Sequence, residues 1–285
     1  MAEQIVNGLA SGSWYALMGL ALVLILRATD VPNFAMAEIG LIPAFVLWTV
    51  TDAGLPYGVA VIVALATGAA LAMVVERLLI RPILAESHFA TVLMTIGAFV
   101  GLNSVTQLVW GSTPRDIDAP FGGSFVLGGI RITADQMLSV AVAAVVAVVL
   151  ARFFRTRRGV EMRAVAEDRV TPRLLGVSLP WVFRTAWGVA GAIAAGAMIL
   201  QAQSTLVTDQ NGGPIILKGF VAATVGGFTS VAGAFWAGLG LGVVENIAGY
   251  SISTSSRPAV ALLAILAVLL LRPQGLFGRA RTREV

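Results

Sequence analysis

Long apolar runs recur along almost the whole chain, and they restrict its possible folds more than any other feature. Eight blocks stand out, at residues 5–26, 31–51, 57–76, 89–110, 134–151, 181–206, 218–250 and 258–271. A helix needs about 20 mostly apolar residues to cross a bilayer. Only 12% of the residues are charged, which is about half the share found in soluble domains. We therefore predict an all-α integral membrane protein, a polytopic helical bundle that forms a single domain over residues 1–285.

The first block is interpreted as a retained membrane span. The residues before its apolar core include no lysine or arginine, whereas a signal peptide begins with a positively charged region. The chain also lacks cysteine, which excludes disulfides and cysteine-ligated metals.

Basic residues gather after the first, third, fifth and last blocks. They are Arg27, Arg77, Arg81, Arg152, Arg155, Arg157, Arg158, Arg163, Arg169, Arg173, Arg272, Arg279, Arg281 and Arg283. Because loops rich in lysine and arginine face the cytoplasm, this pattern predicts an external N-terminus and a cytoplasmic C-terminus. The same placement explains the formal net charge of +4 without any role for nucleic acid.

The seventh block must start and end outside if this orientation holds. It is too long for one ordinary span, and Gly226, Gly227 and Gly233 lie in its first half. Irregular backbone at membrane depth is tolerated where protein or a wet cavity surrounds it. We therefore predict a broken or re-entrant helical hairpin near residues 218–250. The alternative is one long tilted helix followed by a reversed last span.

Two polar segments connect the blocks. Residues 111–133 are rich in glycine, proline and β-branched residues, which favours an ordered external loop with room for a short hairpin. Residues 155–178 carry many charges but favour a helix by propensity. There Met162, Val165 and Ala166 fall on one side, and Gly176 is a natural stop. Such a short amphipathic helix can rest on lipid headgroups or dock into a groove of another protein.

Several stretches together resemble the permeases of branched-chain amino acid (Liv-type) ABC importers. The cytoplasmic stretch RRGVEMRAVAEDRVTPRLLGVSLPWV is similar to a loop of that family. The other stretches are QIVNGLASGSWYALMGLALVLIL, NFAMAE, ERLLIRPIL, FVAATVGGFTSVAGAFWAGLGLGVVE and LLRPQGLFG. They occur in the family's order and cover nearly the whole chain, so the set is specific although each piece alone is weak.

The resemblance implies a function for the cytoplasmic segment. In such importers this loop is a coupling helix that sits in a cleft of a cytoplasmic ATPase subunit. By position, the role falls on Glu161, Arg163, Ala164, Glu167, Asp168, Leu174, Leu175 and Gly176. The implied partners are ABC ATPase subunits, a second permease that is either identical or related, an external solute-binding protein and the lipid of a bacterial inner membrane. No phosphate-binding G-x-x-x-x-G-K-[ST] pattern occurs in this chain. No cofactor is therefore expected here, and ATP and Mg²⁺ belong to the partner.

Polar residues inside the apolar blocks are candidates for a substrate path, because ionisable groups are costly at membrane depth. Glu38 could line that path or pair with Asn7 or another buried donor. A polar stripe that includes Thr95 and Asn103 suits either a solute path or hydrogen bonds between helices. The candidates are Asn7, Asn33, Phe34, Glu38, Thr95, Asn103, Gly227 and Gly233.

We expect a permease subunit without enzymatic activity that takes up branched-chain or related amino acids. Met36, Ala37 and Pro32 depart from the family pattern of histidine, glycine and isoleucine, so urea, short amides or an aromatic acid stay open as solutes. The alternative is a secondary transporter or channel that uses an ion gradient, with Glu38 in a proton relay. A membrane-embedded enzyme is disfavoured because no spans carry paired carboxylates for Mg²⁺ or a serine matched to His88, the only histidine.

Overall fold

The computed structural model describes residues 1–83, 87–118, 121, 123–127, 130–168, 171–272 and 274–278. Its main helices and strands are α1 (Ala2–Thr29), α2 (Met36–Asp52), α3 (Tyr57–Val75), α4 (His88–Trp110), β1 (Ser124–Leu127), β2 (Ile130–Thr133), α5 (Ala134–Phe153), α6 (Arg157–Glu167), α7 (Thr171–Leu174), α8 (Leu179–Ala202), α9 (Gly212–Gly226), α10 (Val231–Ser251) and α11 (Arg257–Leu271). Helix α3 continues through a π-helical turn and a 3₁₀ turn to Ile83.

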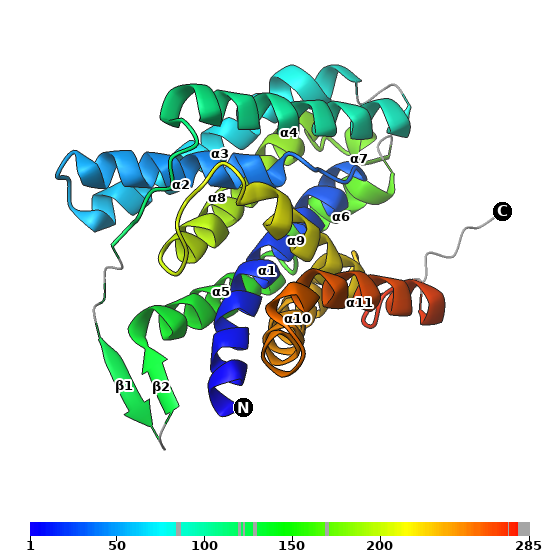
Figure 1. Cartoon of the computed structure of the whole chain (residues 1–285). Coiled ribbons are helices and arrows are strands. Elements are labelled where there is room, and N and C mark those ends of the chain that lie inside the picture. The colour runs from blue at the N-terminus through cyan, green and yellow to red at the C-terminus, as the bar shows by residue number, and fades with distance from the viewer. Residues whose placement is uncertain are drawn as a thin grey trace.

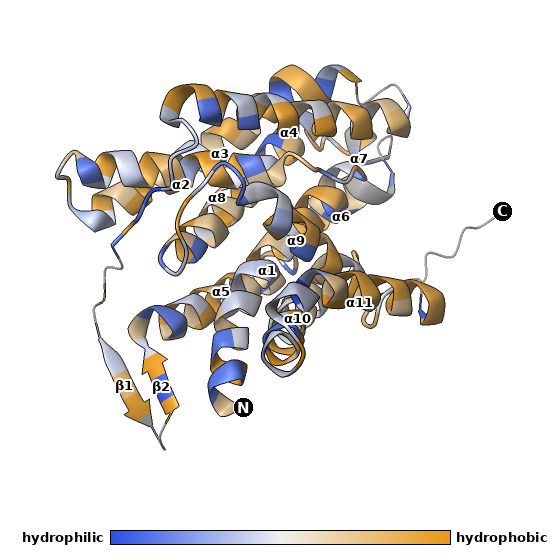
Figure 2. Cartoon of the chain, in the orientation of Figure 1, coloured by the Kyte–Doolittle hydropathy of each residue, from blue (hydrophilic) through white to orange (hydrophobic). Residues whose placement is uncertain are grey.

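The helices form the polytopic membrane bundle that the sequence predicts. Among the described residues, α1, α3 with its extension, α4, α5, α8 and α10 are long and apolar enough to cross a membrane. Helices α9 and α11 are shorter apolar helices of 15 residues each. Figure 2 shows hydrophobic residues along these helices, with hydrophilic residues more frequent at their ends and in the loops. The all-α membrane fold is therefore confirmed.

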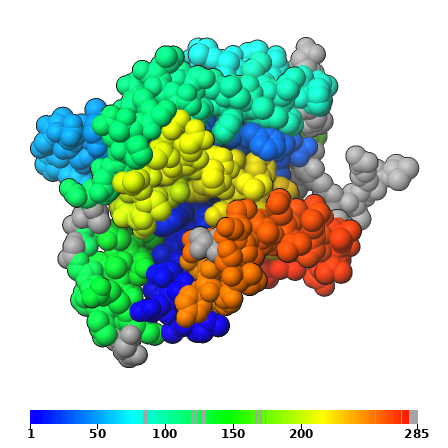
Figure 3. All heavy atoms as spheres, in the orientation of Figure 1, coloured from blue at the N-terminus to red at the C-terminus, as the bar shows by residue number. Residues whose placement is uncertain are grey.

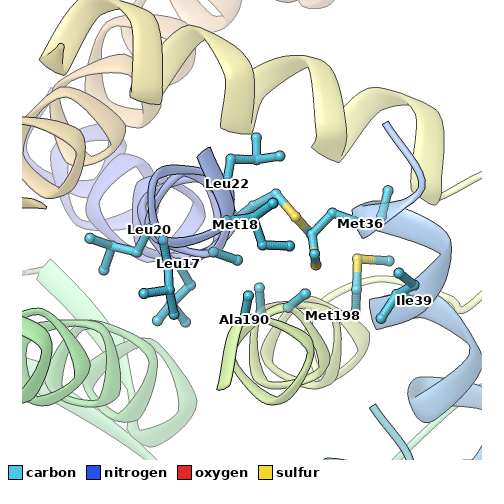
Figure 4. Packing of buried hydrophobic residues seen from close by; sticks show 14 of the residues in the cluster. Leu17, Met18, Leu20, Leu22, Met36, Ile39, Ala190 and Met198 are labelled. Carbon is cyan, nitrogen blue, oxygen red and sulfur yellow. The ribbon is translucent and has the colours of Figure 1, made fainter. Parts of the chain in front are cut away.

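Helix α1 forms the centre of the bundle. It runs through the middle of the molecule in Figure 1, and it is the most deeply buried of the long apolar helices. In Figure 4 its Met18 side chain lies with Met36 of α2 and Met198 of α8. All three methionines are almost completely inaccessible to solvent. Methionine is flexible enough to fill the irregular space where three helices converge.

Small residues bring α1 and α10 into close contact. A Cβ atom added at Gly242 would overlap the backbone of Gly8 and Gly12, and one at Gly238 would overlap Ala16. Helix association in lipid depends on such close packing, because the surrounding tails are as apolar as the side chains. Gly238 and Gly242 of α10 therefore serve bundle packing.

The seventh apolar block is divided into two helices, which confirms the predicted broken hairpin and excludes one long tilted helix. Helix α9 ends at Gly226, a turn follows, and α10 begins at Val231. The two arms touch where Gly233 meets the Gly226 carbonyl oxygen. The first arm begins at Gly212, so the predicted start near residue 218 was too late. The earlier start follows from Gly212, Gly213 and Pro214, which are compatible with the first turn of a helix.

Two ends of the bundle are distinguished by their connections. At one end, β1 and β2 form an antiparallel hairpin in which Phe125 pairs with Ile132. Nearby, Arg115 and Val207 form an isolated antiparallel bridge that ties two loops together. We call this the hairpin end (Figure 1). The opposite end carries α6 and α7 with the basic residues around them, and we call it the arginine-rich end.

Candidate functional site

Helix α6 is anchored to the bundle by one apolar face. Met162 and Val165 are buried, and α6 lies against α1 and α8. The helix begins where the Thr156 hydroxyl accepts a hydrogen bond from Gly159 N at 3.3 Å, a standard N-cap. Gly159 is required here because a side chain would overlap the Phe153 carbonyl oxygen. The sequence pattern thus correctly placed Met162 and Val165 on one face, and the side chain of Ala166 lies outside the described part of the chain.

The segment is divided into two helices, unlike the single short helix expected from sequence. The break follows Glu167, and α7 begins at Thr171. A continuous helix would bring the ring of Pro172 against the carbonyl group of Asp168. Instead, an Asp168 carboxylate oxygen accepts a hydrogen bond from Thr171 N at 3.1 Å. Asp168 therefore caps α7 in this structure.

The solvent-facing side of this segment combines charged and apolar groups. Leu174 and Leu175 are 82% and 80% exposed. Arg163 is also exposed, Ala164 is half-buried, and Gly176 has a positive φ of 83° that ends the second helix. Glu161 forms an ion pair of 3.1 Å with Arg157 on the same helix. The side chain of Glu167 lies outside the described part of the chain.

A second candidate site surrounds Glu38 in the interior of the bundle. The Glu38 side chain is completely inaccessible to solvent, and neither carboxylate oxygen makes a hydrogen bond of normal geometry to any described residue. Asn33 uses its Oδ1 to accept a hydrogen bond from Ala35 N at 3.0 Å. Its Nδ2 is buried without a partner in the described part of the chain. Such unsatisfied polar groups are costly in an apolar interior.

Helix α4 and the loop before α9 complete this cluster. Phe34 N donates a hydrogen bond to Thr95 Oγ1 at 3.3 Å. Asn103 lies close enough to interact with the Glu38 carboxylate, and its Nδ2 donates to the Asp209 carbonyl oxygen at 2.8 Å. The structure therefore brings together the predicted candidates Asn33, Phe34, Glu38, Thr95 and Asn103.

The cluster lies deep in the bundle rather than at its hairpin end. Trp110 Nε1 donates a hydrogen bond to Thr49 Oγ1 at 2.9 Å, where α4 and α2 approach that end. About 16 Å of α2 separates Thr49 from Glu38, at the usual rise per residue. This is roughly half the thickness of a bilayer's hydrocarbon core.

The first turn of α9 meets the Glu38 carboxylate. A Cβ atom added at Gly212 would overlap Glu38 Oε1. Helix α9 has no side-chain cap at its N-terminus, and the Phe220 ring of α9 lies 4.8 Å from the Phe34 ring. In Figure 3, α9 and the loop before it lie across the middle of the face that is shown, between α4 and the α10–α11 pair.

Three of the predicted candidates lie elsewhere. Asn7 Oδ1 accepts a hydrogen bond from Gln136 Nε2 at 2.7 Å, so Asn7 is not the partner of Glu38. Gly227 and Gly233 lie at the turn between α9 and α10, where they allow close backbone contacts. There, Leu276 N donates to the Val225 carbonyl oxygen at 2.8 Å. The residues after α11 thus close the α9–α10 turn.

Sequence reasoning missed a buried ion pair. Lys218, the only lysine, lies in α9 with its Nζ 3.1 Å from Glu245 Oε1 of α10. Lys218 also donates a hydrogen bond to the Tyr15 hydroxyl at 2.8 Å. The sequence did contain a signal for this pair. Lys218 and Glu245 carry opposite charges and both belong to the seventh block, which was predicted to form one hairpin.

A membrane bundle with an interrupted helix hairpin, whose helix start faces buried polar groups, has the architecture of a transport protein. Residues 4–272 match the family described as the branched-chain amino acid transport system permease component. The chain belongs to this family, and it is accordingly a permease subunit of a transport system.

Curated relatives agree with this assignment over almost their entire length. The chain is 29% identical to the high-affinity branched-chain amino acid transport system permease protein LivH of Salmonella typhimurium, with 99% of this chain and 97% of the relative covered. The identity and coverage are the same for the permease protein BraD of Pseudomonas aeruginosa. A probable LivH of Methanocaldococcus jannaschii is 24% identical over 92% of this chain and 88% of its own length.

A solved structure has a similar fold. It is PsaBC from Streptococcus pneumoniae in complex with Fab, with a TM-score of 0.53 and 14% sequence identity. The match covers 96% of this chain and 92% of that chain. At this identity the likeness concerns the fold alone.

Proposed function

We propose that this chain is the permease subunit of an ABC importer for branched-chain or related amino acids. ATP hydrolysis by separate cytoplasmic subunits would drive uptake, and a second permease and an external solute-binding protein would complete the complex. The membrane is a bacterial inner membrane, with the hairpin end outside and the arginine-rich end, including the C-terminus, in the cytoplasm. The basic residues of the latter end support this orientation.

The observation that carries the proposal is the exposed pair Leu174 and Leu175, which lies at the end of α7, next to the anchored helix α6. Two leucines that are 82% and 80% exposed lie beside charged residues at the arginine-rich end. A lipid-resting helix favours a basic polar face, whereas the Arg157–Glu161 pair and Asp168 give this face mixed charge. An apolar tip with mixed charges around it suits a groove on a protein partner.

The contact between α6 and the bundle supplies a route for coupling. Met162 and Val165 pack among buried residues of the core, and α6 lies against α1 and α8. Helix α1 in turn contacts α9 and α10. A movement imposed on α6 and α7 would therefore reach the centre of the bundle through packed side chains.

The test is uptake by the complete transporter reconstituted in liposomes. Charge reversal by Arg163→Glu, or replacement of Leu174 and Leu175 by serine, should abolish ATP-dependent leucine uptake while the complex-free permease keeps its unfolding temperature. Normal uptake by both variants would count against docking at this segment. Uptake that persists without ATPase subunits, and that follows an imposed proton gradient, would instead indicate a secondary transporter.

A further inference from the structure

The Glu38 carboxylate is a buried acidic group that lies against a helix start. Its Oε1 is directed at Gly212, the first residue of α9. The first N–H groups of a helix lack partners within the helix and carry partial positive charge. An anion is therefore favoured at this position, and in this structure Glu38 supplies it.

Glu38 also differs from the other buried acidic residues within the described helices. Glu76 is bound by Arg81 at 2.8 Å, and Glu245 is bound by Lys218 at 3.1 Å. Glu38 has no basic partner there: Asn103 interacts with it, and the nearby Asp209 carboxylate repels its negative charge. A carboxylate held in an apolar interior without a cation is expensive. Its presence at a helix break is therefore more consistent with binding than with packing.

The groups around this carboxylate complement a zwitterion. The first turn of α9 can accept an anion, and the buried Asn33 Nδ2 provides a further donor that has no partner among the described residues. Glu38 can accept a cation. The Phe34 and Phe220 rings, 4.8 Å apart, supply an apolar surface beside the polar groups.

We propose that Glu38 and the first turn of α9 bind the charged end of an α-amino acid during transport. Glu38 accepts hydrogen bonds from the ammonium group, and the α9 N-terminus and Asn33 bind the carboxylate. In the present conformation Glu38 lies on the helix start and the site is closed. An entering zwitterion replaces Glu38 with its own carboxylate and offers its ammonium group to the displaced side chain, so the charge at the helix start stays balanced. This inference rests on the proposed function and deepens it.

The test compares two ligands with the same carbon skeleton. L-leucine carries the ammonium group, whereas 4-methyl-2-oxopentanoate carries a ketone in its place. Binding of each radiolabelled compound is measured by equilibrium dialysis on the permease–ATPase complex in lipid nanodiscs without the solute-binding protein, and leucine uptake by the complete transporter is measured in parallel. Glu38→Gln should weaken leucine binding roughly tenfold or more, as for a lost hydrogen bond to a charged group. Binding of the oxo acid should stay the same or become tighter, because the oxo acid offers no ammonium group to a displaced Glu38 and gains when that charge is removed.

Two further variants separate binding from structure. Glu38→Asp keeps a carboxylate and should retain the preference for leucine over the oxo acid. Glu245→Gln removes a different buried carboxylate and should leave the ratio of the two affinities at its wild-type value. Each variant is first checked for a single symmetric peak in size-exclusion chromatography.

The outcomes distinguish this inference from the proposed function. If the wild type takes up leucine but Glu38→Gln binds leucine normally, or weakens both ligands equally, the inference is overturned and the function stands. The same holds if the wild type takes up leucine but binds neither ligand in nanodiscs. If the wild-type complex takes up no leucine, the proposed function fails and this inference fails with it.

Discussion

The Lys218 ammonium group lies 3.1 Å from a Glu245 carboxylate oxygen, and it donates a hydrogen bond to the Tyr15 hydroxyl at 2.8 Å. These three residues come from α9, α10 and α1. Next to them, Asn246 Nδ2 donates to Ser11 Oγ at 2.7 Å, which adds a second link between α10 and α1. The two arms of the hairpin are thus joined to the central helix by partly buried polar contacts.

We expect Lys218→Met to destabilise the protein because it leaves the buried Glu245 carboxylate without its cation. Removing one member of a buried ion pair costs about 3 kcal/mol or more, whereas replacing both members is far less harmful. The double variant Lys218→Met/Glu245→Gln should therefore be more stable than Lys218→Met alone. The free energy of unfolding in detergent, followed by tryptophan fluorescence, tests this. An equal loss of unfolding free energy in the single and the double variant would contradict a direct ion pair between Lys218 and Glu245.

Gly242→Ala should separate α1 from α10. The added methyl group would overlap the backbone at Gly8 and Gly12, and overpacking of this kind costs about 1–3 kcal/mol. Gly240 belongs to the same helix, but a side chain there would meet nothing within 4 Å. Gly240→Ala should be neutral or slightly stabilising because alanine favours helix. Thermal unfolding of the two variants separates the effect of packing from the effect of helix propensity. Similar unfolding temperatures for Gly242→Ala and Gly240→Ala would refute the close contact.

Gly227→Ala should disturb the turn between α9 and α10 for two reasons. Gly227 has a φ of 89° and a Cβ atom there would lie 2.6 Å from Gly278 N. Gly54 has a similar φ of 83°, with nothing within 4 Å of its Cβ position. Gly54→Ala should therefore lower the free energy of unfolding by the backbone strain alone, about 1 kcal/mol. Gly227→Ala should lower it by clearly more. Hydrogen exchange of residues 224–234 should accelerate in Gly227→Ala alone, and unchanged exchange would argue against a closed turn.

Two apolar residues of the α6–α7 segment should respond differently to truncation. Met162 is 1% exposed, so Met162→Ala should lower the free energy of unfolding by about 2 kcal/mol or more. Leu174 is 82% exposed, so Leu174→Ala should leave stability unchanged and weaken only the binding of a cytoplasmic ATPase. Stability in detergent and co-purification with the ATPase provide the two measurements. A loss of stability in Leu174→Ala would mean that this side chain packs within the permease.

Much of the fold could be predicted because bilayer thickness sets the length of an apolar helix. The block at residues 134–151 corresponds to α5 at Ala134–Phe153. The glycines of the seventh block correctly predicted a broken hairpin. The hydropathy pattern was less informative about where helices start. Helix α9, for example, begins at Gly212 in a stretch that has few apolar residues.

The candidate site was only partly predictable. The family stretch NFAMAE drew attention to Asn33, Phe34 and Glu38, and the polar stripe of α4 added Thr95 and Asn103. No sequence signal placed Gly212 against Glu38, because they meet only when a helix from the second half of the chain packs on α2. Asn7 and Gly227 were expected near the same site, but they bind Gln136 and the residues after α11.

The membrane bundle, the positions of its spans and the charged segment between two of them could all be predicted from the order of residues. These properties depend on the lengths of apolar runs and on the positions of charged residues, which can be read directly from the sequence. The tertiary structure alone decided which polar groups share the interior. Lys218 and Glu245 form a pair, Glu38 lies at the start of α9, and Leu174 is left exposed. Each of these outcomes depends on how elements distant in sequence pack, because packing decides which charged and hydrogen-bonding groups surround a buried carboxylate and which apolar side chains stay uncovered.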